Sequence, residues 1–249
     1  MPITMTLETP KQIEIAGNEK SETVLNYYSD YEASFVILHP FLKIKDGHDL
    51  KFERPNWPTK KQIFESTVPI GWSKIIQDAD LKDIKELDRL LAFLHCAHRN
   101  ANKESWVKFI TSINRNGYII SQVDRFPEIL TQSTLKKLKD LGYEEIYHYS
   151  DISDTKELFK INHLIDSDKA LPEPQTRILT PDKKILFETD FDDRVTYLSS
   201  DKKIIEEIIS IEGFEGFYCD NNTKPYWSYE ELTGETINWQ SKERYIDYC

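Results

Sequence analysis

Glycine is scarce in this sequence, with eight residues among 249, and no glycine-rich phosphate-binding pattern occurs. A loop that cradles the phosphates of a nucleotide needs closely spaced glycines, as in GxGxxG or GxxxxGK[ST]. The pattern GxSxG, which presents a nucleophilic serine, is missing as well. We therefore predict that the protein uses no nucleotide cofactor, and no other residue pattern implies a cofactor.

Cysteines and long apolar runs are also few. The three cysteines, Cys96, Cys219 and Cys249, are far apart, and an odd number without a pairing pattern indicates a reducing compartment. The first 20 residues lack the basic region and apolar run of a secretory signal. The run Phe35–Leu38 is far shorter than the roughly 20 residues that span a bilayer. We expect a soluble cytoplasmic protein with no membrane partner.

Basic residues are fewer than acidic ones, with 32 Lys and Arg against 43 Asp and Glu, so the formal net charge is −11. Nucleic-acid affinity comes largely from Lys and Arg displacing counterions, so this balance argues against a nucleic-acid partner. The charge is also uneven, at −6 over residues 201–249 and +3 over residues 101–140. The asymmetry could guide the acidic C-terminal part onto the basic helical middle or onto a basic partner, and a solvated acidic surface would also explain it.

The apolar patterns predict an α+β fold with a helical middle and a mixed, mainly antiparallel C-terminal sheet. A continuous apolar run predicts a buried strand at residues 34–38, and residues 43–61 read as a loop. Apolar spacings of three and four predict helices over residues 72–100, 103–114 and 134–141. We expect a single domain over residues 1–249, with a boundary between subregions in the polar linker 166–175.

Two segments of the chain resemble each other. Residues 141–151 (LGYEEIYHYSD) and 212–220 (EGFEGFYCD) each follow an expected helix with a glycine, an aromatic residue, a glutamate and a short aromatic-rich strand. Glycine lets the chain reverse in a left-handed conformation at the end of each helix. The resemblance predicts two adjacent strands in one sheet, each with a helix packed against it; chance similarity is the alternative.

The densest carboxylates on an expected turn are Asp190, Asp192 and Asp193. An aspartate after an apolar strand, with a second aspartate two positions later, is the arrangement of phosphatases that phosphorylate the first and use the second as acid and base. Asp193 and Arg194 replace the glycine and threonine usual after the second aspartate, and too little chain follows for that fold. A simple acidic turn fits equally the preference of aspartate for turns. Asp220 and His39 are further catalytic candidates.

His95 and His98 lie three positions apart at the end of the expected helix 72–100. Two imidazoles on one helix face could bind a zinc ion with one or two further ligands. No second pair with matching spacing exists, and helix-end histidines are also favoured by the helix dipole. We therefore predict no metal site and retain this pair as a metal-binding alternative.

Two sets of residues together resemble a known family. They are the strand end His39-Pro40-Phe41, and the stretch KILFETDFDDRVTYL followed by GFEGFYCDNNT and Trp227. Both are similar to an uncharacterised bacterial family found mostly in Bacillus-like Gram-positive species, the domain of unknown function 2711. The resemblance implies a bacterial cytoplasmic protein and supplies no catalytic residues.

The leading hypothesis is therefore a non-enzymatic binding protein of regulatory or immunity type. Its acidic, aromatic C-terminal face would contact a protein partner, because interfaces commonly use aromatic anchors and complementary charge. The alternative is a hydrolase that uses the carboxylates of Asp190 and Asp192 and, with them, Asp220.

Overall fold

The computed structural model describes most of the chain between residues 23 and 238. The described ranges are 23–53, 56–95, 99–150, 155–168, 176–189, 193–225, 227–228 and 234–238. Everything below refers to these ranges.

The largest element is a seven-stranded sheet in which every pairing is antiparallel. Its order is β11-β1-β10-β9-β8-β6-β7. The strands are β1 (Ala33–Leu38), β6 (Glu145–Ser150), β7 (Thr155–Lys160), β8 (Thr176–Leu179), β9 (Leu186–Glu188), β10 (Val195–Ser200) and β11 (Gly216–Tyr218). The predicted α+β class with a mainly antiparallel sheet is confirmed.

Strand β1 is buried on both faces, which is why its sequence is continuously apolar rather than alternating. Val36 and Leu38 belong to one apolar core, and Phe35 and Ile37 belong to a second core on the opposite face. Successive side chains of a strand point to opposite faces, so a single run of five residues supplies both cores. The predicted buried strand at residues 34–38 is confirmed.

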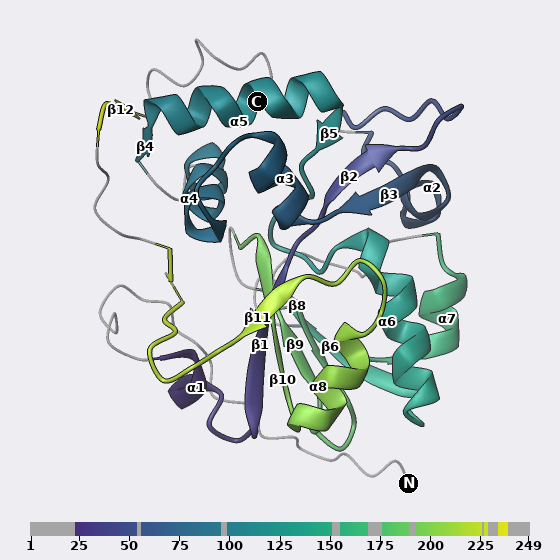
Figure 1. Ribbon diagram of the computed structural model, residues 1–249. Coiled ribbons are helices and arrows are strands. Elements are labelled where there is room, and N and C mark those ends of the chain that lie inside the picture. Colours follow the sequence, from purple (N-terminus) through teal and green to yellow (C-terminus); the bar gives the residue numbers. More distant parts are fainter. Residues whose placement is uncertain are drawn as a thin grey trace, which may run out of the picture.

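The two faces of the sheet contribute to two apolar cores that also contain helical side chains. The first core takes apolar side chains from or beside α1 (Val24–Tyr27), α3 (Trp72–Asp78), α4 (Ile84–Leu94) and α5 (Lys103–Asn116). The second core takes them from α2 (Lys60–Ser66), α6 (Glu128–Asp140), α7 (Ile161–Asp166) and α8 (Lys202–Ile209). In Figure 1, α6, α7 and α8 lie beside the seven-stranded sheet, whereas α3, α4 and α5 lie above the end of the sheet at which β1 continues toward β2.

Two smaller antiparallel sheets complete the described structure. One has the order β3-β2-β5, formed by β3 (Thr67–Ile70), β2 (Phe41–Ile44) and β5 (Tyr118–Ile119). The other pairs β12 (Thr236–Asn238) with β4 (Asn100–Asn102). The predicted loop over residues 43–61 is therefore wrong at both ends, because β2 extends to Ile44 and α2 begins at Lys60.

The expected helix over residues 72–100 is two helices. Helix α3 ends at Asp78, Asp80 has a φ of 50°, and the Asp83 side chain caps the start of α4 by accepting a hydrogen bond from the Glu86 amide at 2.9 Å. A positive φ cannot occur inside a right-handed helix, so the apolar stripe continues across a break. Helix α6 likewise begins at Glu128, six residues before the predicted start of 134.

The two similar segments do form helix and strand pairs, α6 with β6 and α8 with β11. Gly142 and Gly213 have φ values of 95° and 94°, as the helix-ending role predicts. Both helices pack on the second core. The prediction of adjacent strands is wrong, because β1, β10, β9 and β8 separate β11 from β6.

No helix in the described ranges combines the length and apolar character needed to cross a bilayer. The expectation of a single domain with a boundary at 166–175 stays a prediction, because residues 169–175 lie outside the described ranges.

Candidate functional site

The main cavity of interest lies where α2 and α6 begin, and we call it the α2–α6 pocket. Its volume is about 490 Å³, and it is broadly open to solvent. This volume falls within the range of roughly 300 to 1,000 Å³ that small-molecule sites occupy. Eight residues line it: Trp57, Pro58, Thr59, Lys60, Gln122, Arg125, Glu128 and Asp168.

Helix capping fixes two of the charged residues in the wall. The Thr59 hydroxyl caps α2 by accepting a hydrogen bond from the Gln62 amide, and the side-chain oxygen of Gln62 accepts one from the Thr59 amide at 2.9 Å. This reciprocal capping box sets Lys60 as the first helical residue. Pro127 occupies the corresponding position before α6, so Glu128 is the first residue of that helix. Two helix starts therefore bring an amine and a carboxyl group to one cavity.

Lys60 is 4% exposed, which is unusual for a lysine. Its Nζ donates a hydrogen bond to the main-chain oxygen of Leu164, and its amide donates to the main-chain oxygen of Asp168 at 3.2 Å. Burial lowers the pKa of the Lys60 amine, and the nearby charges of Asp168 and Asp166 act in the opposite direction. The amine is thus held in a largely enclosed position at the cavity wall.

Glu128 is 5% exposed, and the pKa of its carboxyl group is raised, whereas that of the Lys60 amine is lowered. Burial raises the pKa of its carboxyl group, while its own main-chain amide and the charge of Arg125 act to lower it. Buried groups whose pKa values are displaced, placed together at a cavity, are characteristic of functional sites. The pocket therefore combines a cavity with two such groups.

Two donor groups of the wall have no acceptor. The Nε of Arg125 and the indole Nε1 of Trp57 are buried, and neither has a hydrogen-bond partner within the described part of the chain. The Trp57 ring packs edge-on against Phe52, with ring centroids 5.0 Å apart. Buried donors are nearly always paired in folded proteins. Other buried polar atoms, such as the indole Nε1 of Trp106, also lack a partner in the described residues, so what distinguishes these two donors is their position at a cavity.

His39, a catalytic candidate from the sequence, lies in a different place. It is 4% exposed at the end of β1, and its Nε2 shares a hydrogen bond with Oγ1 of Thr196 at 2.8 Å. Thr196 in turn bonds Oγ1 of Thr189 at 2.6 Å. Burial and then the charge of Arg194 lower the pKa of His39 to about 3, so the ring is neutral at ordinary pH. These contacts fit a structural imidazole rather than a proton carrier.

Next to His39, Arg194 forms a buried ion pair with Asp88 of α4. Its Nε and one terminal nitrogen donate to the two carboxylate oxygens, each at 2.6 Å. The hydroxyl of Ser228 donates to the same carboxylate, and Arg89 donates to the Ser228 main-chain oxygen at 2.8 Å. We call this group of Asp88, Arg194 and Ser228 the carboxylate clasp. It ties α4 to the start of β10 and to the C-terminal segment.

The acidic turn is described only in part. Asp190 and Asp192 lie outside the described residues, so the predicted hydrolase geometry stays a prediction. The main-chain oxygen of Asp193 accepts a hydrogen bond from the Asp124 amide at 3.1 Å. Asp220 is exposed and accepts hydrogen bonds from the Asn222 amide at 2.9 Å and the Thr223 hydroxyl at 2.8 Å. These contacts, led by the Thr223 hydroxyl, lower the pKa of Asp220 and stabilise a turn.

The metal alternative is not assembled in the described residues. His95 follows α4, whereas His98 and Cys96 lie outside the described ranges. Across those ranges, no group of three or more His, Cys, Asp or Glu residues is placed to hold a metal ion. Cys219 is a free thiol, and burial with the charge of Asp220 raises its pKa to about 12. A thiol that stays protonated is a poor nucleophile.

The acidic C-terminal residues contact the basic middle of the same chain. Lys103 pairs with Glu235 at 2.7 Å, and Lys137 pairs with Glu207 at 3.3 Å. These pairs are partly exposed, so each adds little stability. The charge asymmetry allowed the acidic C-terminal part to contact either the basic helices of the same chain or a basic partner. The first of these has direct contacts.

The C-terminal aromatic residues are partly used for packing. The Trp227 ring stacks edge-on against Phe217 at 5.0 Å, and both pack on the first core. Tyr218 is exposed, with the Lys202 amine 5.6 Å from its ring centre. Tyr226, Tyr229 and the last aromatic residues lie outside the described ranges, so the predicted aromatic face stays a prediction.

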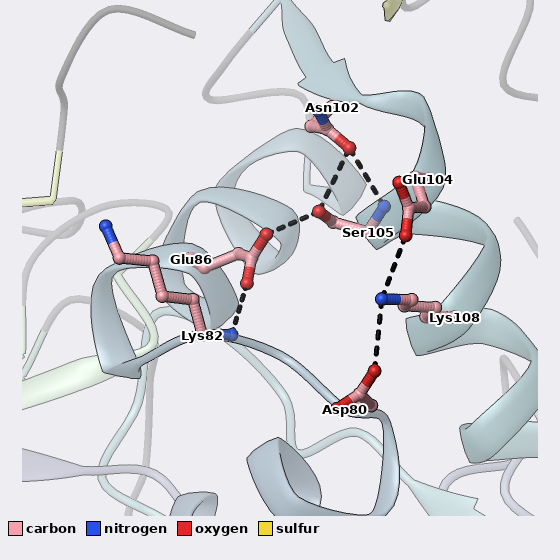
Figure 2. A network of polar contacts seen from close by, with 7 residues as sticks. All are labelled: Asp80, Lys82, Glu86, Asn102, Glu104, Ser105 and Lys108. Carbon is pink, nitrogen blue, oxygen red and sulfur yellow. Dashed lines mark hydrogen bonds and ion pairs between the residues drawn. The ribbon is translucent and has the colours of Figure 1, made fainter. Parts of the chain in front are cut away.

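A further polar network joins the starts of α4 and α5 (Figure 2). The Glu86 carboxylate accepts hydrogen bonds from the Lys82 amide and the Ser105 hydroxyl, and Ser105 also bonds the Asn102 side chain at 3.0 Å. Lys108 lies between Glu104 at 2.9 Å and Asp80 at 3.2 Å. Because its groups satisfy one another, this network is structural and holds the two helices together.

Sequence reasoning missed the α2–α6 pocket. The lining residues come from three segments, and residues 57–60 fall inside the stretch that was read as a loop. One signal could have been used: Thr59 and Gln62 have the spacing of a capping box, which marks a helix start. Nothing in the sequence places Lys60 beside residues 122–128 and 168.

Residues 20–229 match the family model described as protein of unknown function (DUF2711). Comparison with curated proteins and with solved structures finds no match.

Proposed function

Because this chain belongs to the DUF2711 family, a family of proteins of unknown function, we propose its function from the geometry of the site. We propose that it is a non-enzymatic binding protein and that the α2–α6 pocket holds a small polar ligand. The observation that carries this proposal is the pair of buried donors without acceptors, on Arg125 and Trp57, in the wall of a cavity of about 490 Å³. A ligand oxygen would complete their hydrogen bonds.

Binding is favoured over catalysis because the pocket has no hydroxyl or thiol nucleophile with an adjacent base, and the Lys60 amine, whose pKa burial lowers, is already bonded to the main-chain oxygen of Leu164. Its hydroxyl group, on Thr59, is already used to cap α2. Nucleophilic catalysis needs a side chain activated by a neighbouring base or by a lowered pKa. Arg125, Gln122 and Trp57 instead present hydrogen-bonding and aromatic surface, the usual means of orienting a small ligand.

A screen of polar metabolites tests this proposal. The purified full-length protein would be incubated with a defined library, and retained compounds would be identified by equilibrium dialysis and mass spectrometry. We expect at least one compound that loses about tenfold or more in affinity in Arg125→Gln, since one charged hydrogen bond is worth roughly 1.5 to 3 kcal/mol. The exposed Arg115→Gln variant is the matched control and should bind normally.

Either of two results would contradict the proposal. One is that no library compound binds the wild-type protein. The other is that every bound compound binds Arg125→Gln as tightly as it binds Arg115→Gln, which would locate binding elsewhere.

The cellular location and the partners of the protein are part of the same proposal. The free Cys219 thiol and the lack of a cysteine pairing pattern support a reducing, cytoplasmic location in a bacterial cell. The net charge of −11 supports the absence of a nucleic-acid partner. A protein partner at the acidic C-terminal face and hydrolase chemistry at residues 190–193 stay predictions.

A further inference from the structure

Four charged side chains line the α2–α6 pocket, two of each sign. Lys60 and Arg125 are cationic groups, and Glu128 and Asp168 are carboxylic groups. All four belong to the described part of the chain, and none of them forms an ion pair with another of the four. Their charges do act on one another, Asp168 on Lys60 and Arg125 on Glu128, but without a direct ion pair each group can still contact a ligand.

The four groups form two neighbouring pairs of opposite charge. Lys60 and Asp168 are joined through the main chain, since the Lys60 amide donates to the Asp168 oxygen at 3.2 Å. Arg125 and Glu128 lie three positions apart at the start of α6. A simple anion beside either cationic group would also lie near a carboxyl group, and a simple cation beside either carboxyl group would also lie near a lysine or an arginine. Like-charge contacts of this kind penalise singly charged ligands.

From this arrangement we infer that the ligand of the pocket is an amino-acid-type zwitterion, which carries a carboxylate and an ammonium group on one small molecule. The inference rests on the proposed function of the pocket. The carboxylate accepts hydrogen bonds from Arg125 or Lys60, and the ammonium donates to Glu128 or Asp168. The Trp57 ring supplies apolar surface for the remainder of the ligand.

The test uses three matched sets of probes on the full-length protein. The first set is the 20 standard L-amino acids. For each one that binds, the second and third are its analogue without the amino group and its analogue without the carboxylate. Affinities are measured by isothermal titration calorimetry. We expect at least one amino acid to bind and each of its two analogues to bind at least about tenfold more weakly, because each loses one charged contact.

Two variants locate the charges. Arg125→Gln should weaken the amino acid and its carboxylate analogue but leave the amine analogue unchanged, and Glu128→Gln should show the reverse pattern. Glu128→Gln is also expected to remain folded, because it removes a carboxyl group whose burial disfavours the ionised form. Glu65→Gln, an exposed change on α2, is the control for general effects on that surface.

The inference is overturned if no amino acid binds, or if either singly charged analogue binds as tightly as the amino acid. If the metabolite screen still finds a compound whose binding depends on Arg125, the proposed function stands and only the ligand class is wrong. If neither experiment finds binding that depends on Arg125, both are wrong.

Discussion

The protonation of His39 links the stability of the folded protein to pH. Its ring is 4% exposed, and its folded-state pKa of about 3 lies below the usual value of 6.5. The unfolded chain therefore binds a proton at this position before the folded chain does, and protonation favours unfolding. The contribution of His39 to stability is complete above about pH 6.5 and is lost as the pH falls from there toward 3.

We predict that the free energy of unfolding of the wild type falls by about 2 kcal/mol between pH 7 and pH 5 because of His39 alone. His39→Gln keeps an amide nitrogen that can bond Thr196 and removes the titrating group. Urea titrations at the two pH values should therefore show a pH dependence about 2 kcal/mol smaller in this variant.

His48→Gln is the matched control for the loss of a histidine, because His48 is exposed. An equal pH dependence in His39→Gln and the wild type would show that His39 is not held neutral.

Gly216 shows how closely two elements can approach. It opens β11 and pairs with Ile37 of β1. A Cβ added at Gly216 would overlap the main-chain oxygen of Val36 and the ring of Phe35. Its φ is not in the left-handed region, so this glycine is required by the close contact between strands and not by backbone conformation.

We predict that Gly216→Ala lowers the free energy of unfolding by about 1 to 3 kcal/mol, the usual cost of overpacking, because β11 must move away from β1. Gly117→Ala provides a comparison, since Gly117 has a φ of 65° and open space around the added atom. Its cost should be about 1 kcal/mol, from the left-handed conformation alone. Urea unfolding that gives Gly216→Ala the smaller loss would contradict the overlap.

Elements with one dominant signal could be predicted from the sequence. Strand β1 was found because its apolar run is short and ends at a proline, and α5 was found because its stripe ends near Gly117. The break between α3 and α4 was missed because the apolar spacing runs through it, whereas the φ of Asp80 and the capping of α4 by Asp83 mark it in the structure. Helix α2 was missed because Pro55 and Pro58 before it and the charged residues around them are typical of a loop, whereas its position depends on packing against α6.

Across the whole molecule, the carboxylate clasp connects parts that are distant in sequence. Asp88 and Arg194 are 106 positions apart, and Asp88 and Ser228 are 140 apart. The Asp88 and Arg194 side chains are only 2% and 11% exposed. Removing one partner of such a pair leaves a buried charge without compensation, which costs much more than the pair itself contributes.

We predict that Arg194→Met lowers the free energy of unfolding by about 3 to 5 kcal/mol. The double variant Asp88→Asn with Arg194→Met should lose clearly less than the sum of the two single losses, because it leaves no unpaired charge. Urea unfolding of the four proteins measures this coupling. Additive losses would show that the two groups act independently.

The α2–α6 pocket could not be predicted from the sequence, and the reason concerns how distant segments meet in the whole molecule. The pocket is made by residues 57–60, 122–128 and 168, and in each segment the residue types are ordinary for a surface. What distinguishes Lys60 and Glu128 is their burial, and burial follows from how α2, α6 and α7 meet. His39, by contrast, was a candidate from the sequence, but it lies beside Arg194 in a buried structural network.

Strand β1 lies between two strands that come from the other end of the chain, and Ser34 faces Ser199 across 165 positions of sequence. During synthesis this strongly apolar strand leaves the ribosome long before β10 and β11 exist to pair with it. Contacts so distant in sequence form slowly, and an unpaired apolar strand is prone to aggregation. We expect the nascent chain to depend on a chaperone that shields residues 33–38 until the rest of the sheet has been made.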